Sequence, residues 1–164
     1  MWKAVGQGKA VSLLQRSMEI GSLAHAYIFI GPPNVGKMTL ALDLAQALNC
    51  RESDPPCGEC VSCRKISSAN HADIQIISLS QNGNPEENKP RTEIGIDQVR
   101  QMQHSASLPP FEGEYKVFII DSAEFLSNEA ANCLLKTLEE PIDRVIFILL
   151  TTNDRLLPAT VISR

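Results

Sequence analysis

An α/β domain, in which helices cover both faces of a parallel β-sheet, is the fold that the sequence predicts. Short β-branched and aromatic runs alternate along the chain with longer stretches that carry apolar side chains at helical spacing. This alternation indicates strand–helix–strand units, which build parallel sheets. The length of 164 residues suits one hydrophobic core, because a domain usually holds about 100–200 residues.

The expected strands are short, nearly continuous apolar runs, a pattern typical of strands buried on both faces of a sheet. They cover residues 26–30, 74–79, 116–121 and 144–151. The expected helices carry one apolar stripe each, and the last of them is ended by Pro141. They cover residues 11–18, 37–48, 94–105 and 128–140. The segment 81–91 is polar and rich in Asn and Pro, which predicts a mobile loop.

Composition and charge exclude several classes of protein. Fifteen Lys and Arg against nineteen Asp and Glu give a net charge of −4, the opposite of a basic nucleic-acid footprint. Any contact with DNA must therefore be local or made through partners. The longest apolar run, residues 145–150, is far short of the roughly 20 residues that cross a bilayer, and the N-terminus lacks a signal-peptide core. We expect a cytoplasmic protein with no membrane contact.

A phosphate-binding loop is expected between the first strand and the next helix. Residues 31–37 read GPPNVGK, and Gly-x4-Gly-Lys in this position is typical of a P-loop. Backbone N–H groups of such a loop point at phosphate oxygens, and Lys37 adds a positive charge at the β and γ phosphates. A Gly/Pro-rich turn is the simpler alternative. The residues expected to contact ATP or ADP here are Gly31, Asn34, Val35, Gly36, Lys37, Met38 and Thr39.

Magnesium is expected to be poorly positioned at this loop. The P-loop pattern requires a Ser or Thr hydroxyl after the lysine as a Mg²⁺ ligand, and this sequence has Met38 there. A thioether cannot replace a hard oxygen ligand. Thr39 is about 100° further around the helix, so it should not reach the same point. Nucleotide binding can survive this change while Mg²⁺ positioning is weakened.

Asp121 ends the third expected strand, where a carboxylate reaches the Mg²⁺ shell of P-loop proteins. Many such ATPases have a Glu directly after this Asp to orient the attacking water, but here Ser122 follows, and Glu124 comes later. Hydrolysis at this chain's own site is therefore expected to be weak or absent. A role for Asp121 as a turn residue only is the alternative.

Four of the five cysteines lie within residues 50–63. Four thiolates in a tetrahedral set select zinc and leave no open position for a substrate, which indicates a structural site. An unmetallated redox set is the alternative, because a Cys-x2-Cys pair can serve that role. The expected zinc ligands are Cys50, Cys57, Cys60 and Cys63.

Six segments are more specific than the strand and helix pattern. They are AVGQ at 4–7, HAYIFIGPPNVGK at 25–37, the cysteine set at 50–63, KVFIIDSAEFLSNEAANCLLKTLEEP at 116–141, LLTTND at 149–154 and LLPATVISR at 156–164. In this order they resemble the AAA+ nucleotide-binding domain of bacterial DNA polymerase III clamp-loader subunits, the gamma/tau and delta prime group. The resemblance covers essentially the whole chain.

The resemblance implies a function in DNA replication. An ATP-driven pentamer opens the ring-shaped sliding clamp and loads it onto primed DNA, and this chain would be one subunit beside gamma/tau and delta within the DNA polymerase III holoenzyme. It implies that Val5 and Gly6 line the adenine pocket and that Thr152 and Asn153 form sensor 1 at the γ-phosphate. It also implies that Arg164 acts as an arginine finger in a neighbour's ATP site, a role suited to its fixed charge.

Two departures from the family pattern bear on which subunit this is. Gamma/tau keeps the hydroxyl residue after the P-loop lysine and Asp-Glu at the end of the third strand, whereas this chain has Met38 and Ser122. Both losses favour a delta prime-like subunit that donates Arg164 and hydrolyses little or no ATP. The alternative is a gamma/tau-type ATPase motor that tolerates Met38 and uses Glu124 to orient water.

The resemblance also predicts the domain organisation. Residues 1–164 match one AAA+ domain, with residues 50–63 as an inserted zinc module. The lid and the C-terminal collar of the family would lie beyond Arg164, so we expect an N-terminal fragment. Because the collar supplies assembly, the isolated piece is expected to be monomeric.

Overall fold

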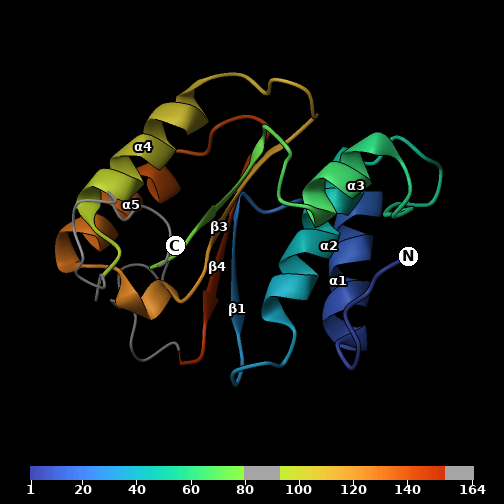
Figure 1. The fold of residues 1–164 in the computed structure, drawn as a ribbon, viewed down its shortest axis with the longest axis horizontal. Helices are drawn as coiled ribbons and strands as arrows, with labels where there is room; N and C mark the ends of the chain where they lie inside the picture. Colours follow the sequence, from blue (N-terminus) through green and yellow to red (C-terminus); the bar gives the residue numbers. More distant parts are fainter. Residues whose placement is uncertain (80–92, 154–164) are drawn as a thin grey trace.

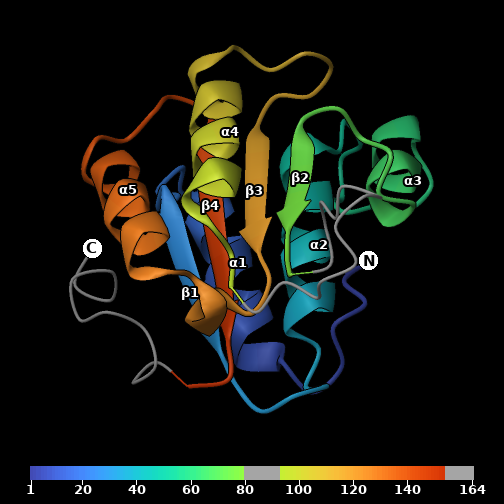
Figure 2. The ribbon, with the colours of Figure 1, turned by 60° about the vertical axis from the view of Figure 1, so that its left-hand side comes forward.

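Parallel strands form the centre of the protein, whose computed structural model describes residues 1–79 and 93–153. The strands are β1 (Ala26–Ile30), β2 (Ile74–Ile77), β3 (Lys116–Ile120) and β4 (Val145–Thr151). In the described ranges they form one sheet in the order β1-β4-β3-β2 with every pair parallel (Figure 2). All carboxyl ends therefore meet at one edge, where open α/β sheets bind ligands.

Helices cover both faces of the sheet (Figure 1). One side carries α1 (Gly8–Glu19) and α2 (Lys37–Asn49), with α3 (Val61–Ser67) packed on α2. The other side carries α4 (Ile96–Ser107) and α5 (Asn128–Glu139). A 3₁₀ turn, η1 (Ala123–Phe125), follows β3. Within residues 1–79 and 93–153, no helix has the length and apolar character needed to cross a bilayer.

The two central strands divide their side chains between two apolar layers. Because successive side chains of a strand point to opposite faces, every second residue packs on the same helices. In β4, Val145, Phe147 and Leu149 pack with the residues of α4 and α5, whereas Ile146, Ile148 and Leu150 pack with those of α1 and α2. The rings of Phe118 and Phe147 stack at 5.4 Å between centroids. β3 and β4 are thus buried on both faces, as their continuous apolar runs predict.

The α/β fold with a parallel sheet flanked by helices is confirmed, and the element bounds agree within a few residues. Burial on both faces was wrong for the two edge strands: four residues of β1 are half-buried and Ile30 is 53% exposed, and three of the four residues of β2 are half-buried. The reason is that each lies at an edge of the described sheet, β1 paired only with β4 and β2 only with β3. α3 and η1 were not predicted. The expected loop 81–91 lies outside the described residues.

Candidate functional site

The expected phosphate loop connects β1 to α2 and requires glycine at two positions. Gly36 caps α2 in the left-handed conformation, with φ of 94°, which residues with a side chain rarely adopt. A Cβ on Gly31 would lie 2.9 Å from Cγ1 of Val35, closer than real side-chain contacts. Asn34 also has a positive φ, 62°, which asparagine tolerates best after glycine. The glycines of the motif therefore set the path of this loop.

Lys37 curls back over the loop. Its Nζ donates to the backbone oxygens of Gly31 at 2.6 Å and Pro32 at 2.8 Å. Both carbonyls are neutral acceptors, whereas a phosphate oxygen carries a negative charge, so its bond to the ammonium group gains the attraction of opposite charges as well. Lys37 is therefore in a suitable position to bind a phosphate. It begins α2, and the dipole of that helix also favours an anion at its N-terminal end.

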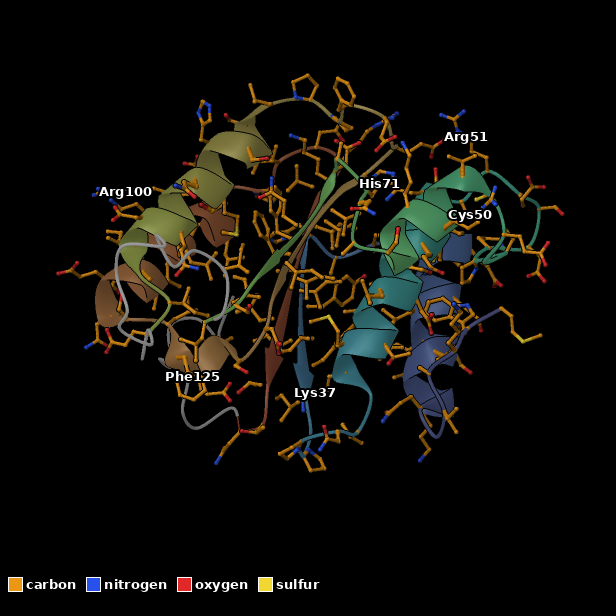
Figure 3. The ribbon with its side chains drawn as sticks, viewed as in Figure 1. Lys37, Cys50, Arg51, His71, Arg100 and Phe125 are labelled. Carbon is orange, nitrogen blue, oxygen red and sulfur yellow. The ribbon has the colours of Figure 1, made fainter. Side chains whose placement is uncertain are left out.

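A hollow of about 640 Å³ opens beside the loop at the carboxyl edge of the sheet. It brings together seven of the expected site residues, namely Asn34, Gly36, Lys37, Met38, Thr39, Asp121 and Thr152. Figure 3 shows Lys37 at one end of α2 and Cys50 at the other, with Phe125 of η1 at the same end as Lys37. The nucleotide-contacting residues expected from separate parts of the sequence thus form one concave surface.

The hollow also shows what occupies the position of the missing hydroxyl. Met38 is half-buried and packs against the apolar layer of α1 and α2, so its thioether both lines the hollow and fills part of that core. Thr39 is exposed and lines the same hollow. The residue after Lys37 therefore has no oxygen atom in its side chain to bind Mg²⁺, whereas Asp121 still offers a hard oxygen ligand.

Glu124 enters the hollow through an unusual turn. Ser122 has a left-handed backbone, with φ of 56°, and the following 3₁₀ turn returns Glu124 to the surface that Asp121 lines. The Thr152 hydroxyl lies 3.4 Å from Oε1 of Glu124. Oε2 of Glu124 is buried and has no hydrogen-bond partner among the described residues. A buried acceptor left without a donor is costly.

Two further residues that sequence reasoning missed shape the edges of the site. The side chain of Gln7 donates to the backbone oxygen of Val35 at 3.2 Å, which ties the N-terminal segment to the phosphate loop. Thr151 ends β4, and its hydroxyl both donates to the backbone oxygen and accepts from the N–H of Asn153. The sequence did contain signals that point to both residues. Gln7 belongs to the AVGQ segment, and Thr151 directly precedes the two expected sensor residues.

The N-terminal segment that was expected to line an adenine pocket lies against α2. Oδ2 of Asp43 accepts hydrogen bonds from the N–H groups of Lys3 at 2.6 Å and Ala4 at 2.9 Å. A second hollow, of about 340 Å³, is lined by Gln7, Gly31 and Val35 among mainly apolar neighbours. Val5 is 90% exposed, and neither it nor Gly6 lines the two hollows. The adenine role of Val5 and Gly6 stays a prediction.

The four expected zinc ligands form one cluster. The sulfur atoms of Cys50, Cys57, Cys60 and Cys63 all lie within 4.8 Å of one another. The Cys57 and Cys63 sulfurs are 3.9 Å apart, close to the roughly 3.8 Å that Zn–S bonds of about 2.3 Å give in a tetrahedron. This separation, in a set of soft donors, fits a zinc ion with four thiolate ligands.

The thiols of the cluster differ in acidity. Hydrogen bonds from the N–H groups of Cys60 and Glu59 lower the pKa of Cys57 to about 7. Burial raises the pKa of Cys63 to about 12, and burial also raises that of Cys50. Only the thiolate binds metal strongly, so ligation must displace protons from Cys50 and Cys63, whose pKa values are raised. A four-thiolate shell leaves no open position, which gives the site a structural rather than a catalytic character.

Some expected site residues are placed differently or lie outside the description. Gly31 and Val35 line the second hollow rather than the first. Asn153 is exposed next to Thr152 and follows the end of β4. Arg164, the expected arginine finger, lies outside the described residues, so its role stays a prediction.

Relatives by sequence are subunits of bacterial DNA polymerase III. The tau subunit of Bacillus subtilis (strain 168) is 38% identical over 162 residues, which cover 98% of this chain and 27% of that protein. The tau subunit of Escherichia coli (strain K12) is 36% identical, with 98% and 24% covered. The chain therefore spans about a quarter of the length of these relatives. A family model described as DNA polymerase III, delta subunit matches residues 6–164.

Solved structures show the same fold at low identity. A gamma subunit-related protein of DNA polymerase III from Thermotoga maritima superposes with a TM-score of 0.63 at 23% identity, over 92% of this chain and 43% of that one. The Bacillus subtilis DNA clamp loader delta protein gives 0.51 at 15% identity, over 93% and 39%. The sequence relatives and the family match go further than the fold: this chain belongs to the DNA polymerase III delta subunit family and carries a clamp-loader AAA+ domain.

Proposed function

We propose that the protein is a delta prime-like subunit of the DNA polymerase III clamp loader. In this proposal it helps to load the sliding clamp onto primed DNA, binds beside gamma/tau and delta subunits, and contacts DNA through the assembled complex. It donates Arg164 to the ATP site of a gamma/tau neighbour and hydrolyses little or no ATP itself. The observation that carries the proposal is Met38, a thioether in the hollow where a Mg²⁺-binding hydroxyl would be needed.

The absence of a glutamate directly after Asp121 also supports a subunit with little or no ATP hydrolysis of its own. The residue after Asp121 is Ser122, whose left-handed backbone begins the turn into η1. A water-orienting carboxylate directly after Asp121 is therefore missing, while Lys37 and the loop N–H groups keep the features of a phosphate site. This combination suits a subunit that binds ATP or ADP through its P-loop without efficient turnover, since hydrolysis needs both the metal and an oriented water.

The test is the ATPase rate of a clamp loader reconstituted with the full-length protein. Arg164→Ala is expected to lower the rate while the assembly stays intact. Removal of an arginine finger costs about 10³–10⁵ at the site it serves, although the other sites of the complex dilute the observed loss. Arg100→Ala is a matched control, because Arg100 is exposed on α4, far from Lys37 (Figure 3). An unchanged rate in an intact complex with Arg164→Ala would contradict the proposal.

The second candidate is a gamma/tau-type ATPase motor, and the position of Glu124 favours it. Glu124 lines the hollow that Lys37 and Asp121 also line, which is a suitable place for a group that orients water. Turnover by the full-length protein alone would support this candidate if it is lost in Lys37→Ala and lowered at least about tenfold in Glu124→Gln. The same result would contradict the delta prime-like assignment.

A further inference from the structure

The loop between α4 and β3 is held by two buried side chains. Asp73 accepts hydrogen bonds from the N–H groups of Phe111 (2.6 Å), Glu112 (2.8 Å) and Gly113 (2.6 Å). Oδ1 of Asn49 accepts from the next two, those of Glu114 (2.8 Å) and Tyr115 (3.0 Å). Every backbone N–H of residues 111–115, called the held loop below, is thus bound by a side chain from elsewhere in the chain.

These contacts are shielded from water and fit closely. Asp73 is 2% exposed and Asn49 is 3% exposed, and a hydrogen bond is electrostatically stronger in such a low-dielectric place. A Cβ on Gly113 would lie 2.3 Å from Oδ1 of Asn49 and 3.1 Å from Cε1 of His71. The held loop therefore packs directly on its two acceptors, while the Phe111 side chain remains 86% exposed.

A third connection reaches the held loop from α3. Nζ of Lys65 forms an ion pair of 2.5 Å with Oε2 of Glu112, and Oε1 of Glu112 accepts from the N–H of Ala72 at 2.9 Å. These two partners lower the pKa of Glu112, so the carboxylate stays ionised at neutral pH. Glu112 thus links the held loop to α3 and to the segment that leads from α3 into β2.

Two of the residues that hold the loop flank the cysteine cluster in sequence. Asn49 directly precedes Cys50, and Lys65 follows Cys63 by half a turn of α3. Figure 3 shows Cys50 and His71 at the same end of the molecule, opposite Lys37. α3 has 7 residues, far fewer than an isolated helix needs to be stable. Its position relative to α2 must therefore come from packing, from the 2.7 Å hydrogen bond between Gln46 and Ser67 and, when a metal is bound, from the ion that the four sulfurs share.

We propose that the cysteine cluster acts as a brace for the held loop. One metal ion bound by the four thiolates ties Cys50, at the end of α2, to Cys63, on α3. It thereby keeps Asn49 on one side and Lys65 on the other where residues 111–115 bind them. The metal site fixes a loop more than forty residues away in sequence, a role that neither the ATP site nor the arginine finger requires.

If the metal braces the held loop, its removal should increase hydrogen exchange locally, at residues 111–115. With zinc bound, the amides of residues 111–115 should exchange slowly with solvent, because each donates to a buried acceptor, Asp73 or Asn49. Without zinc, α3 and α2 are joined by packing and by the hydrogen bond that Nε2 of Gln46 donates to Oγ of Ser67, and these amides should exchange at least about tenfold faster. The amides of β3 and β4 should not change, since their protection depends on the sheet.

The test is hydrogen exchange of the full-length protein, followed by mass spectrometry, in its zinc-loaded and chelator-stripped forms. A rise confined to residues 111–115 and the cluster itself is the expected result. Unchanged exchange of residues 111–115 after measured loss of zinc, with β4 still protected, would overturn the proposal. This readout does not depend on nucleotide or on clamp loading, so failure of the proposed function leaves it unaffected.

A substitution decides the matter if stripping unfolds the whole chain. Lys65→Met keeps most of the apolar length of the side chain but removes the ion pair to Glu112, and we expect zinc to stay bound because all four cysteines are kept. Faster exchange of Glu112 and Gly113, by roughly threefold or more, would support the brace, and no change would overturn it. Arg64→Met is the matched control, because Arg64 is an exposed residue on the same helix with its side chain outside this set of contacts.

Discussion

The hydroxyl of Thr152 lies 3.4 Å from Oε1 of Glu124 and donates to it, so the end of β4 is joined to the turn that follows β3. Both residues line the hollow beside the phosphate loop. The contact fixes the glutamate at this surface and leaves its other oxygen as a buried acceptor. This pair suits both candidate functions, because a carboxylate here can orient a water or only support the shape of the hollow. Met38 is the residue that separates the two functions.

Restoring a hydroxyl after Lys37 should restore magnesium dependence. In Met38→Thr, an oxygen ligand replaces a thioether, so Mg²⁺ is expected to tighten ATP binding by about tenfold, or roughly 1.4 kcal/mol. The wild-type protein should show little such enhancement. Calorimetric titration with ATP, with and without Mg²⁺, checks this.

Met38→Leu is the control for packing, because it keeps the apolar volume and adds no oxygen. Met38 packs on the layer of α1 and α2, so the threonine variant should also lose about 1–2 kcal/mol of unfolding free energy. Equal Mg²⁺ enhancement in the leucine and threonine variants would show that the hydroxyl does not reach the metal.

Removing the ammonium group of the phosphate loop should abolish most nucleotide affinity. Lys37→Ala is expected to weaken ATP binding by about tenfold or more, because a charge-assisted bond contributes roughly 1.5–3 kcal/mol. Its present acceptors are two loop carbonyls, so the fold should be retained. Lys9→Ala, on an exposed site of α1, is the matched control. Undiminished binding in Lys37→Ala would argue against a working phosphate loop.

The strong patterns of the sequence predicted most of the fold. β3 and β4 were predicted from their apolar runs, which are continuous because both strands contact helices on both faces of the sheet. The bounds of α5 were predicted from its apolar stripe. α3 was missed because 7 residues are too few for a hydrophobic period to show. The exposure of β1 was missed because position in a sheet depends on strand order, which a local run does not contain.

The parts of the candidate site that lie within one continuous segment could be predicted from the sequence. The P-loop and the cysteine set are contiguous motifs whose spacing reflects their chemistry. The contact between Glu124 and Thr152 could not be foreseen, because it depends on the left-handed Ser122 and on β3 lying beside β4. The held loop is similar: Asp73 and Asn49 are polar residues at the ends of apolar elements, and only the tertiary structure shows that both accept from residues 111–115.

Zinc binding should depend steeply on pH. The protein is expected to hold about one zinc per chain, because four thiolates close one tetrahedral shell. Burial raises the pKa of Cys50, and that of Cys63 to about 12, so both thiols are protonated at neutral pH in the metal-free protein. Binding then releases roughly two protons or more, and affinity must rise with pH.

Competition with a chromophoric chelator between about pH 6 and about pH 8 measures this slope. Cys60→Ser should lose most of the zinc affinity, whereas Cys133→Ser, on α5 and away from the cluster, should bind as the wild type does. A metal-free protein with four accessible thiols and unchanged stability would refute the structural zinc site.

His71 should make the fold less stable as the pH falls. Its side chain is fully buried, Nδ1 accepts from the N–H of Asp73 at 3.1 Å, and Nε2 has no partner among the described residues. Burial lowers the pKa of His71 below its ordinary value of 6.5, even though the carboxylates of Glu112 and Asp73 favour the charged ring. The unfolded chain therefore takes up a proton at a higher pH than the folded one does.

Stability from His71 is fully present above pH 6.5 and is lost as the pH falls towards the lowered pKa of the folded state. His71→Asn keeps an acceptor for the Asp73 N–H but cannot titrate. Urea unfolding on both sides of pH 6.5, at a constant zinc concentration, should show a larger loss of unfolding free energy in the wild type than in His71→Asn. Because both proteins share the cysteine cluster, the difference between them isolates the histidine, and identical pH dependence would mean that His71 does not contribute.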